Sequence, residues 1–286
     1  MKIGVSSYSF KKHLLATKCN YLELCDTVKE MGFSGIEFTP LGGYPDSMLG
    51  SEEETAIQIR EHCAKIGLEI VAYTVGASLA DENADESLQQ LLHHIDIAAL
   101  LGAKLLRHDV CSKLPEGHLV TWKDMIPLMV PRIRRATEYA ASKGIRTCTE
   151  NHGRIFQAPE RVEALIQAVG SDNYGWLCDM GNFMGVDAEP ARSVAIAAKY
   201  AFHVHAKDNL FKSGTCRQPV GFNVTAGGNY YRGTTIGHGV VPVDQCIRIL
   251  EKNGYNGYVS IEFEGKEECV PAIAAGLEYL QGIIQK

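Results

Sequence analysis

Short runs of hydrophobic residues alternate with longer amphipathic stretches along the whole chain. Eight such runs predict buried strands, at residues 2–7, 35–39, 69–76, 104–110, 145–151, 175–181, 202–208 and 258–265. Between them, hydrophobic residues recur every three or four positions, as at 21–32, 52–67 and 131–144, which predicts helices that bury one face. Proline is expected near the start of two helices, at Pro159 and Pro190. Glycines that favour a left-handed helix end follow the helical stretches, at Gly32, Gly67, Gly102, Gly144, Gly170 and Gly254.

Eight strands that each precede a helix predict the α/β class and a single (β/α)8 TIM barrel, formed as one domain by residues 1–286. A doubly wound open sheet is the alternative architecture. Its glycine-rich GxGxxG turn does not follow the first strand, so the barrel is favoured.

One connection is far longer than the others. Residues 209–241, after the seventh strand, show no helical period and are rich in glycine, tyrosine, threonine and arginine. Loops beyond about 15 residues are uncommon in compact domains and often act as lids or binding loops. We expect a long loop at the barrel mouth, and both a lid and a contact with another subunit stay open.

The composition narrows the class of protein. A net charge of −6 lacks the basic footprint typical of proteins that bind nucleic acid. No stretch reaches the roughly 20 hydrophobic residues that span a bilayer, and the first residues do not resemble a signal peptide. The nine cysteines have irregular spacing and no CxxC pair, which indicates free thiols in a reducing compartment. We therefore predict a cytoplasmic protein with neither a nucleic-acid nor a membrane partner.

Four consecutive predicted strands, the fifth to the eighth, end in a side chain that can bind a metal. These are Glu150, Asp179, His205 and Glu262. Neighbouring strands lie about 4.8 Å apart, so the four side chains can converge at the barrel mouth. Three carboxylates and one imidazole suit one divalent ion, with Mn²⁺ expected first and Mg²⁺ or Co²⁺ as alternatives. The competing interpretation is that each residue is separately paired with lysine or arginine around the rim.

The motifs around these residues carry a resemblance to a known family. TENHG, CDMGN, HVHAKD and SIEFEG occur in order at the four strand ends, and GFSGIEF matches the second strand. Together they resemble the sugar isomerase/epimerase branch of the xylose-isomerase-like TIM barrels, over essentially the whole chain. The resemblance implies that the four residues above are the metal ligands, that Glu150 and Glu262 flank the reacting carbon, and that the chain associates as a homo-oligomer.

Such a site favours reactions that begin by removing a proton beside a carbonyl group. A metal bound to a hydroxy-ketone stabilises the enediolate, and a carboxylate takes the proton. The main prediction is an isomerase or epimerase of a sugar or keto-sugar. Elimination from the same intermediate gives the alternative, a dehydratase or lyase that acts on an inosose or a 3-keto-glycoside, alone or as a subunit of a complex that cleaves C-glycosides. A non-catalytic barrel that binds a sugar or cyclitol is a further alternative.

Three departures from the family pattern argue against a ketose 3-epimerase. That branch carries glutamate, histidine and arginine where this chain has Phe156, Asn182 and Phe211. Asn182 also stands where the related endonuclease IV branch would need a further histidine, and the acidic balance disfavours DNA.

Further residues are candidates because of their position near strand ends. His152 shares the strand parity of Glu150 and is predicted to shuttle protons as a catalytic residue. In RHDV only one parity faces inward, and we favour His108. Lys207 could bind a substrate oxygen or neutralise Glu37 or Glu150. Glu37 could instead lie behind the metal ligands or be structural, and His238 could belong to a turn and make no ligand contact. The predicted substrate-binding residues are Tyr8, Glu37, His108, Asn182, Lys207 and His238.

Overall fold

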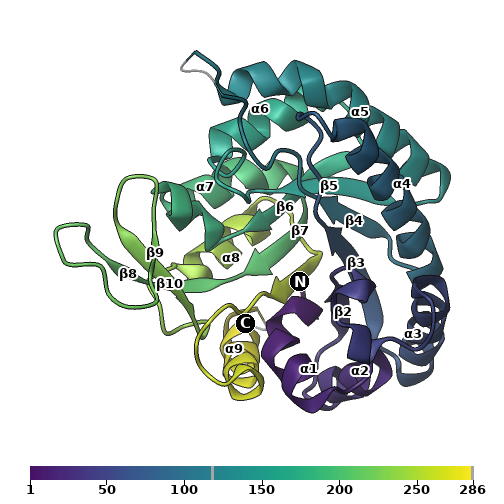
Figure 1. Ribbon diagram of the computed structural model, residues 1–286. Coiled ribbons are helices and arrows are strands. Elements are labelled where there is room, and N and C mark those ends of the chain that lie inside the picture. Colours follow the sequence, from purple (N-terminus) through teal and green to yellow (C-terminus); the bar gives the residue numbers. More distant parts are fainter. Residues whose placement is uncertain (117–118, 285–286) are drawn as a thin grey trace.

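A computed structural model describes residues 1–116 and 119–284 and shows a closed barrel of parallel strands ringed by helices (Figure 1). Around the barrel the order is β1-β2-β3-β4-β5-β6-β7-β11. Each predicted strand is confirmed and overlaps its run in the sequence. The bounds are β1 (Lys2–Ser6), β2 (Gly35–Phe38), β3 (Glu69–Val75), β4 (Leu105–His108), β5 (Arg146–Glu150), β6 (Tyr174–Asp179), β7 (Ala201–Ala206) and β11 (Tyr258–Ile261).

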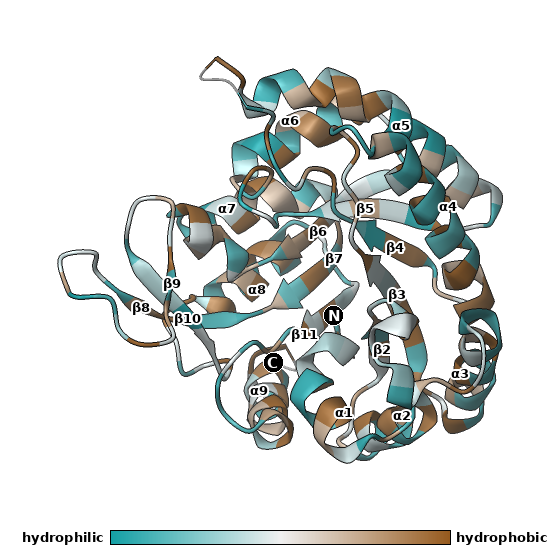
Figure 2. Cartoon of the chain, in the orientation of Figure 1, coloured by the Kyte–Doolittle hydropathy of each residue, from teal (hydrophilic) through white to brown (hydrophobic). Residues whose placement is uncertain are grey.

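The helices pack their hydrophobic faces against the outside of the barrel, and brown and teal alternate along them in Figure 2. The predicted ends are confirmed: all six glycines have positive φ, and Pro159 and Pro190 begin α6 and α7. The helix expected at 131–144 begins earlier, at Trp122, and accommodates Pro127 and Pro131 on its exposed side. The bounds are α1 (Lys11–Thr17), α2 (Tyr21–Glu30), α3 (Glu52–Ile66), α4 (Ala84–Leu101), α5 (Trp122–Ser142), α6 (Pro159–Val169), α7 (Pro190–Ala197), α8 (Val243–Lys252) and α9 (Cys269–Ile284).

Side chains fill the lower half of the barrel below the level of the predicted ligands. Cys148 and Leu177 lie two positions before Glu150 and Asp179, so they point inward beneath them. At the strand starts, Gly175 leaves room for Phe202, because an added Cβ would lie 2.5 Å from its ring. The cluster consists of Val71, Ala72, Leu105, Cys148, Leu177 and Tyr258, with Phe202 packed against it.

The long segment after β7 contains a small sheet that the sequence did not predict. Strands β8 (Asp208–Lys212), β9 (Asn223–Val224) and β10 (Tyr230–Thr234) form an antiparallel sheet in the order β8-β10-β9, which projects beside the barrel (Figure 1). The Asp208 carboxylate accepts hydrogen bonds from the backbone of Gly237, Gly239 and Val241, which ties the end of the segment to its beginning. The segment is therefore anchored at its base.

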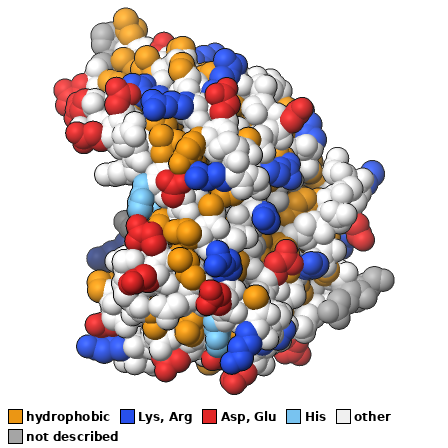
Figure 3. All heavy atoms as spheres, turned by 90° about the vertical axis from the view of Figure 1, so that its right-hand side faces the viewer, with side chains coloured by type: hydrophobic (Ala, Val, Ile, Leu, Met, Phe, Trp, Pro, Cys, Tyr) orange, Lys and Arg blue, Asp and Glu red, His pale blue; other side chains and the backbone are white. Residues whose placement is uncertain are grey.

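On the face that carries α3 and α4, basic and acidic side chains are interspersed (Figure 3). Within residues 1–116 and 119–284, no helix combines the length and the hydrophobicity needed to cross a bilayer.

Candidate metal centre

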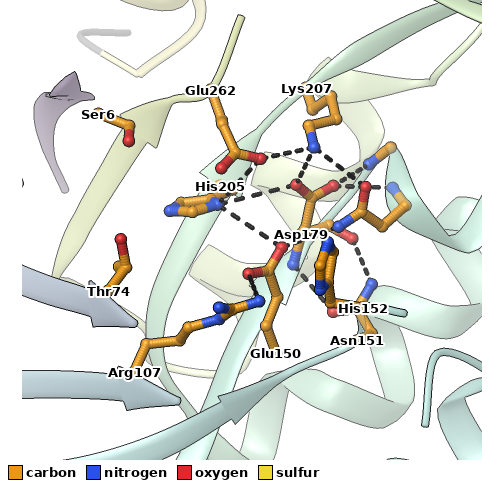
Figure 4. Close-up of polar contacts among 12 residues, drawn as sticks. Ser6, Thr74, Arg107, Glu150, Asn151, His152, Asp179, His205, Lys207 and Glu262 are labelled. Atoms are coloured by element: carbon orange, nitrogen blue, oxygen red, sulfur yellow. Dashed lines mark hydrogen bonds and ion pairs between the residues drawn. The ribbon is translucent and has the colours of Figure 1, made fainter. Parts of the chain in front are cut away.

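The four predicted ligands converge at the carboxyl ends of four adjacent strands (Figure 4). Glu150 and Asp179 end β5 and β6, His205 lies near the end of β7, and Glu262 directly follows β11. Asp179 and His205 are register partners, which places them side by side. One ligand atom from each of the four residues lies within 4.8 Å of the others.

Asp179 is held so that one of its oxygens stays available. Its Oδ1 accepts hydrogen bonds of 2.8 Å from the backbone N–H groups of Gly181 and Asn182. Asn151 joins β5 to β6, since its side chain donates to the Asp179 carbonyl and accepts from the Asp179 N–H. Oδ2 is buried and has no hydrogen-bond partner among the described residues, although the Lys207 ammonium lies 3.2 Å away, so this oxygen already faces a positive charge and can bind a cation in its place.

His205 is oriented by a carboxylate behind it. Glu37, on β2, is 0% exposed, and its two oxygens lie 2.7 Å from Nε2 of His203 and Nε2 of His205. Burial works against the charge of Glu37, but the two imidazoles outweigh it and hold the pKa of this carboxyl well below its usual range. With Nε2 engaged, His205 presents Nδ1 to the other ligands, and that buried atom has no partner among the described residues. Glu37 thus supports a ligand and does not line the cavity, so its prediction as a substrate contact is wrong.

Glu150 lies between a guanidinium and an amide. Its Oε2 is 2.7 Å from Arg107 Nη2, and its Oε1 accepts a 2.8 Å hydrogen bond from Asn182. Burial raises the pKa of Glu150 to about 6, although the Arg107 charge opposes this. A carboxylate poised in this way can hold a proton near neutral pH.

Glu262 is paired with the ammonium of Lys207, 2.5 Å away, and Lys207 also lies 3.2 Å from Asp179 and 3.1 Å from Glu264. Burial works to raise the pKa of Glu262, but Lys207 and His205 outweigh it and hold the pKa well below the ordinary value. Lys207 neutralises carboxylates, but its partners are Asp179, Glu262 and Glu264 and not the expected Glu37 or Glu150; its contact with substrate stays a prediction.

The donor set fits a divalent ion. Two ligands about 2.1 Å from one ion are about 3.0 Å apart at right angles and about 4.2 Å apart when opposite. His205 Nδ1 lies 3.8 Å from Glu150 Oε1, 3.8 Å from Asp179 Oδ2 and 3.5 Å from Glu262 Oε2, all within that range. Glu37, His203 and His205 form a second cluster, but there the polar atoms already bond one another. The first set is therefore the candidate metal centre.

The cavity above the ligands brings together four of the other candidates. Tyr8, His152 and Lys207 line both a chamber of about 320 Å³ at the ligands and a neighbouring one, and Asn182 lines the neighbour. His152 Nδ1 lies 2.9 Å from Asp109 Oδ1, and this hydrogen bond is the main cause of the raised pKa of His152. An imidazole at the cavity wall, oriented by a carboxylate, is suited to donate a proton.

Two candidates lie elsewhere. His108 is fully buried on the outer side of β4, 5.8 Å between ring centroids from Tyr174, and its predicted inward orientation is wrong. Arg107 takes the inward position and lines the chamber instead, which the alternation in RHDV would also have allowed. His238 is exposed on the loop after β10 and lines none of the described cavities, so a substrate contact there is not supported.

The comparison with family models agrees with this architecture. The model described as "Xylose isomerase-like TIM barrel" matches residues 25–283, and the chain belongs to this family. The class of protein is therefore a xylose-isomerase-like barrel with a candidate metal centre at its mouth.

Similar proteins include inosose dehydratases. That of Glaesserella parasuis is 24% identical over 252 residues, covering 84% of this chain and 83% of the relative. That of Clostridium perfringens is 23% identical over 278 residues, covering 92% and 87%.

Solved structures share the fold over nearly the whole chain. A probable 3-DHS dehydratase, AsbF from Bacillus anthracis, superposes with a TM-score of 0.76 at 18% identity, covering 98% of this chain and 99% of that one. The IolI protein with a bound zinc atom gives 0.75 at 17%, covering 100% and 98%. An L-ribulose 3-epimerase gives 0.74 at 16%, covering 99% and 94%.

Proposed function

We propose that the protein is a divalent-metal-dependent dehydratase that removes water from an inosose or a related keto-sugar. The observation that carries this proposal is the convergence of four ligand atoms within 4.8 Å, two of which, Asp179 Oδ2 and His205 Nδ1, are buried without a hydrogen-bond partner among the described residues. The choice of dehydration rests on the relatives named inosose dehydratase, which favour the predicted alternative over the main prediction of an isomerase or epimerase.

The residues proposed to hold the metal are Glu150, Asp179, His205 and Glu262. A divalent ion supplies Lewis acidity, which stabilises negative charge on the ketone oxygen of the substrate. A zinc atom in the similar IolI structure supports a divalent ion, and we keep Mn²⁺ as the first expectation.

We assign the proton transfers to residues at the chamber wall. Either Glu150 or Glu262 takes the proton from the carbon beside the ketone, and the electron pair of that bond forms the new double bond. The hydroxyl on the next carbon leaves as water with a proton from His152, which Asp109 holds in place. Tyr8 and Lys207 line the same chamber and can orient the remaining hydroxyl groups.

An epimerase would use the same first step but return the proton to carbon. The structure gives no support to the 3-epimerase pattern at the three departing positions. Phe156 is buried, Asn182 bonds Glu150, and Phe211 is 41% exposed on β8. We therefore place epimerisation second.

The test is dehydration of an inosose by the purified chain in deuterated water. After chelation and dialysis, activity should disappear, and Mn²⁺, Mg²⁺, Co²⁺ or Zn²⁺ should restore it. Product formation is followed by ultraviolet absorbance of the unsaturated ketone, and proton exchange is followed by NMR. Asp179→Asn is the matched variant, since it keeps the shape and removes the ligand charge. Full activity in a metal-free preparation would refute the proposal, whereas exchange without loss of water would favour an epimerase.

Homo-oligomeric association and a cytoplasmic location stay predictions. Light scattering of the purified chain tests the first, and cell fractionation tests the second.

A further inference from the structure

A second chamber adjoins the metal centre and is larger than it. Its volume is about 510 Å³, against about 320 Å³ for the chamber at the ligands, and the two share Tyr8, His152, Lys207 and Glu264. Its outer wall comes from the β8–β10 sheet and its connections, through Gly221, Asn223, Tyr231, Arg232 and Gly233. A molecule that reacts at the metal centre can therefore extend beneath this sheet.

The walls of the second chamber are strongly basic, although the chain as a whole has a net charge of −6. Its one acidic wall residue among the described positions, Glu264, is already paired with Lys207 at 3.1 Å. Five further basic residues come from four parts of the chain, and none of them forms an ion pair with a described residue. These residues are Lys11, Lys12, Arg154, Arg232 and Lys266.

Arg232, on β10, has an unsatisfied group in this wall. Its Nε is buried and has no hydrogen-bond partner among the described residues, while its guanidinium lies 5.3 Å from the ring centroid of Phe222. The nearby Glu267 accepts a hydrogen bond from Thr234 and lies beyond ion-pair distance of Arg232, so its charge acts on the guanidinium only at longer range. The buried Nε therefore leaves one charge-assisted hydrogen bond unmade.

Other basic side chains reach across the chamber from the barrel. An added Cβ at Gly221 would lie 1.7 Å from Lys266 Nζ, so this glycine leaves open the space that the ammonium occupies. Arg154 donates a 2.7 Å hydrogen bond to the Val224 carbonyl, which fixes it against β9 with further N–H groups to spare. Lys12 is directed to the Gly265 carbonyl at 2.9 Å. Arg154 and Lys12 are thus held by backbone carbonyls, and neither they nor Lys266 form an ion pair with a described carboxylate.

We propose that this basic chamber binds an anionic group, a carboxylate or a phosphate ester, carried by the part of the substrate that extends beyond the reacting ring. The proposal rests on the proposed function for the reacting end only. The principal contacts are Arg232 and Lys266, which face the anion from the sheet and from the loop after β11. A carboxylate or phosphate supplies the acceptor oxygens that Arg232 lacks.

Binding of three probes that share a ring tests the proposal: glucose, glucuronate and glucose 6-phosphate. Calorimetric titration of the full, metal-loaded chain at low and high salt gives their affinities. We expect at least one anionic probe to bind about tenfold or more tightly than glucose, since hydrogen bonds to charged groups are the stronger ones. The preferred probe distinguishes a phosphate ester from a carboxylate. The preference should weaken at high salt, because the wall is partly open to solvent.

The matched proteins are the double variant Arg232→Gln/Lys266→Gln and the control Lys252→Gln, which removes one positive charge at the exposed end of α8, outside the cavities. The double variant should lose about tenfold or more of the anion preference, and the control should keep it. Equal binding of all three probes, or a preference that survives in the double variant, would overturn the proposal. If the double variant does not fold, the wild-type preference and its salt dependence still decide. If anions bind preferentially but no inosose is turned over, the anion-binding proposal stands and the proposed dehydratase function fails. If an inosose is dehydrated but anions are not preferred, the proposed function stands and the anion-binding proposal fails.

Discussion

Replacing Glu37 by glutamine tests whether a residue that cannot touch substrate controls the metal centre. The carboxylate accepts hydrogen bonds from both His203 and His205 at 2.7 Å and is 0% exposed. A glutamine of nearly the same shape keeps one acceptor oxygen and puts an NH₂ group toward the other imidazole. One of the two hydrogen bonds is then lost and the other no longer has a charged acceptor, so His205 is no longer fixed with Nδ1 toward the other ligands.

The size of the effect follows from that loss. A hydrogen bond to a charged group contributes about 1.5–3 kcal/mol, so metal binding should weaken by roughly 10- to 150-fold. Loss of a partner behind a metal-binding histidine typically weakens metal binding about 10- to 100-fold, which agrees.

Metal affinity is measured by competition with a chromogenic chelator, with circular dichroism to confirm folding. Glu251→Gln, at an exposed position of α8, is the control for loss of one negative charge. A folded Glu37→Gln protein that binds Mn²⁺ or Zn²⁺ as tightly as wild type would refute the role of Glu37 in orienting His205.

Three further changes have defined outcomes. Glu150→Gln and Glu262→Gln should each lower turnover by about two orders of magnitude, because both remove a charge and a basic group, and near-normal rates in both would place the acid and base elsewhere. Arg107→Met removes the guanidinium that lies 2.7 Å from the buried Glu150 carboxylate and 2.8 Å from Asp109. The free energy of unfolding should therefore fall by about 3–5 kcal/mol, and an unchanged melting temperature in calorimetry would contradict this. His152→Gln and Asp109→Asn should each slow dehydration, and the double variant should be no slower than His152→Gln, because Asp109 acts through that imidazole. If the losses in turnover of the two single variants add up in the double variant, the two residues act independently and this role of Asp109 is contradicted.

The sequence allowed the four ligands to be found because each is a polar side chain at the end of a hydrophobic strand. It could not decide between Arg107 and His108, since β4 is buried on both faces and both residues are at most 7% exposed. Hydrophobic alternation marks a direction only where one face of a strand meets water. The long hydrocarbon stem and charge of Arg107 face inward because Glu150 lies there to pair with it.

The sequence also could not predict how deep within the barrel an inward-facing side chain lies. Glu37 points inward as its position suggested, yet it lies behind His205 and not at the cavity wall. Depth depends on the stagger between strands, and here β2 and β3 also shift register between Ile36 and Glu37. The basic chamber could not be predicted from the sequence either, because Lys11, Arg154 and Lys266 are far apart along the chain and come together only when the barrel closes.

Among residues 1–116 and 119–284, the filled lower half of the barrel closes the metal centre from below. Phe202 and Tyr258 pack the strand starts with Val71, so metal and substrate reach the ligands from the mouth, where the two chambers and a third cavity beside Glu150 and His152 open. A substrate bound in the chamber at the ligands would then lie between the ion and the solvent. Chelators should accordingly remove the metal slowly from protein with bound substrate and quickly from protein without it. The substrate itself would then slow dissociation of the metal ion.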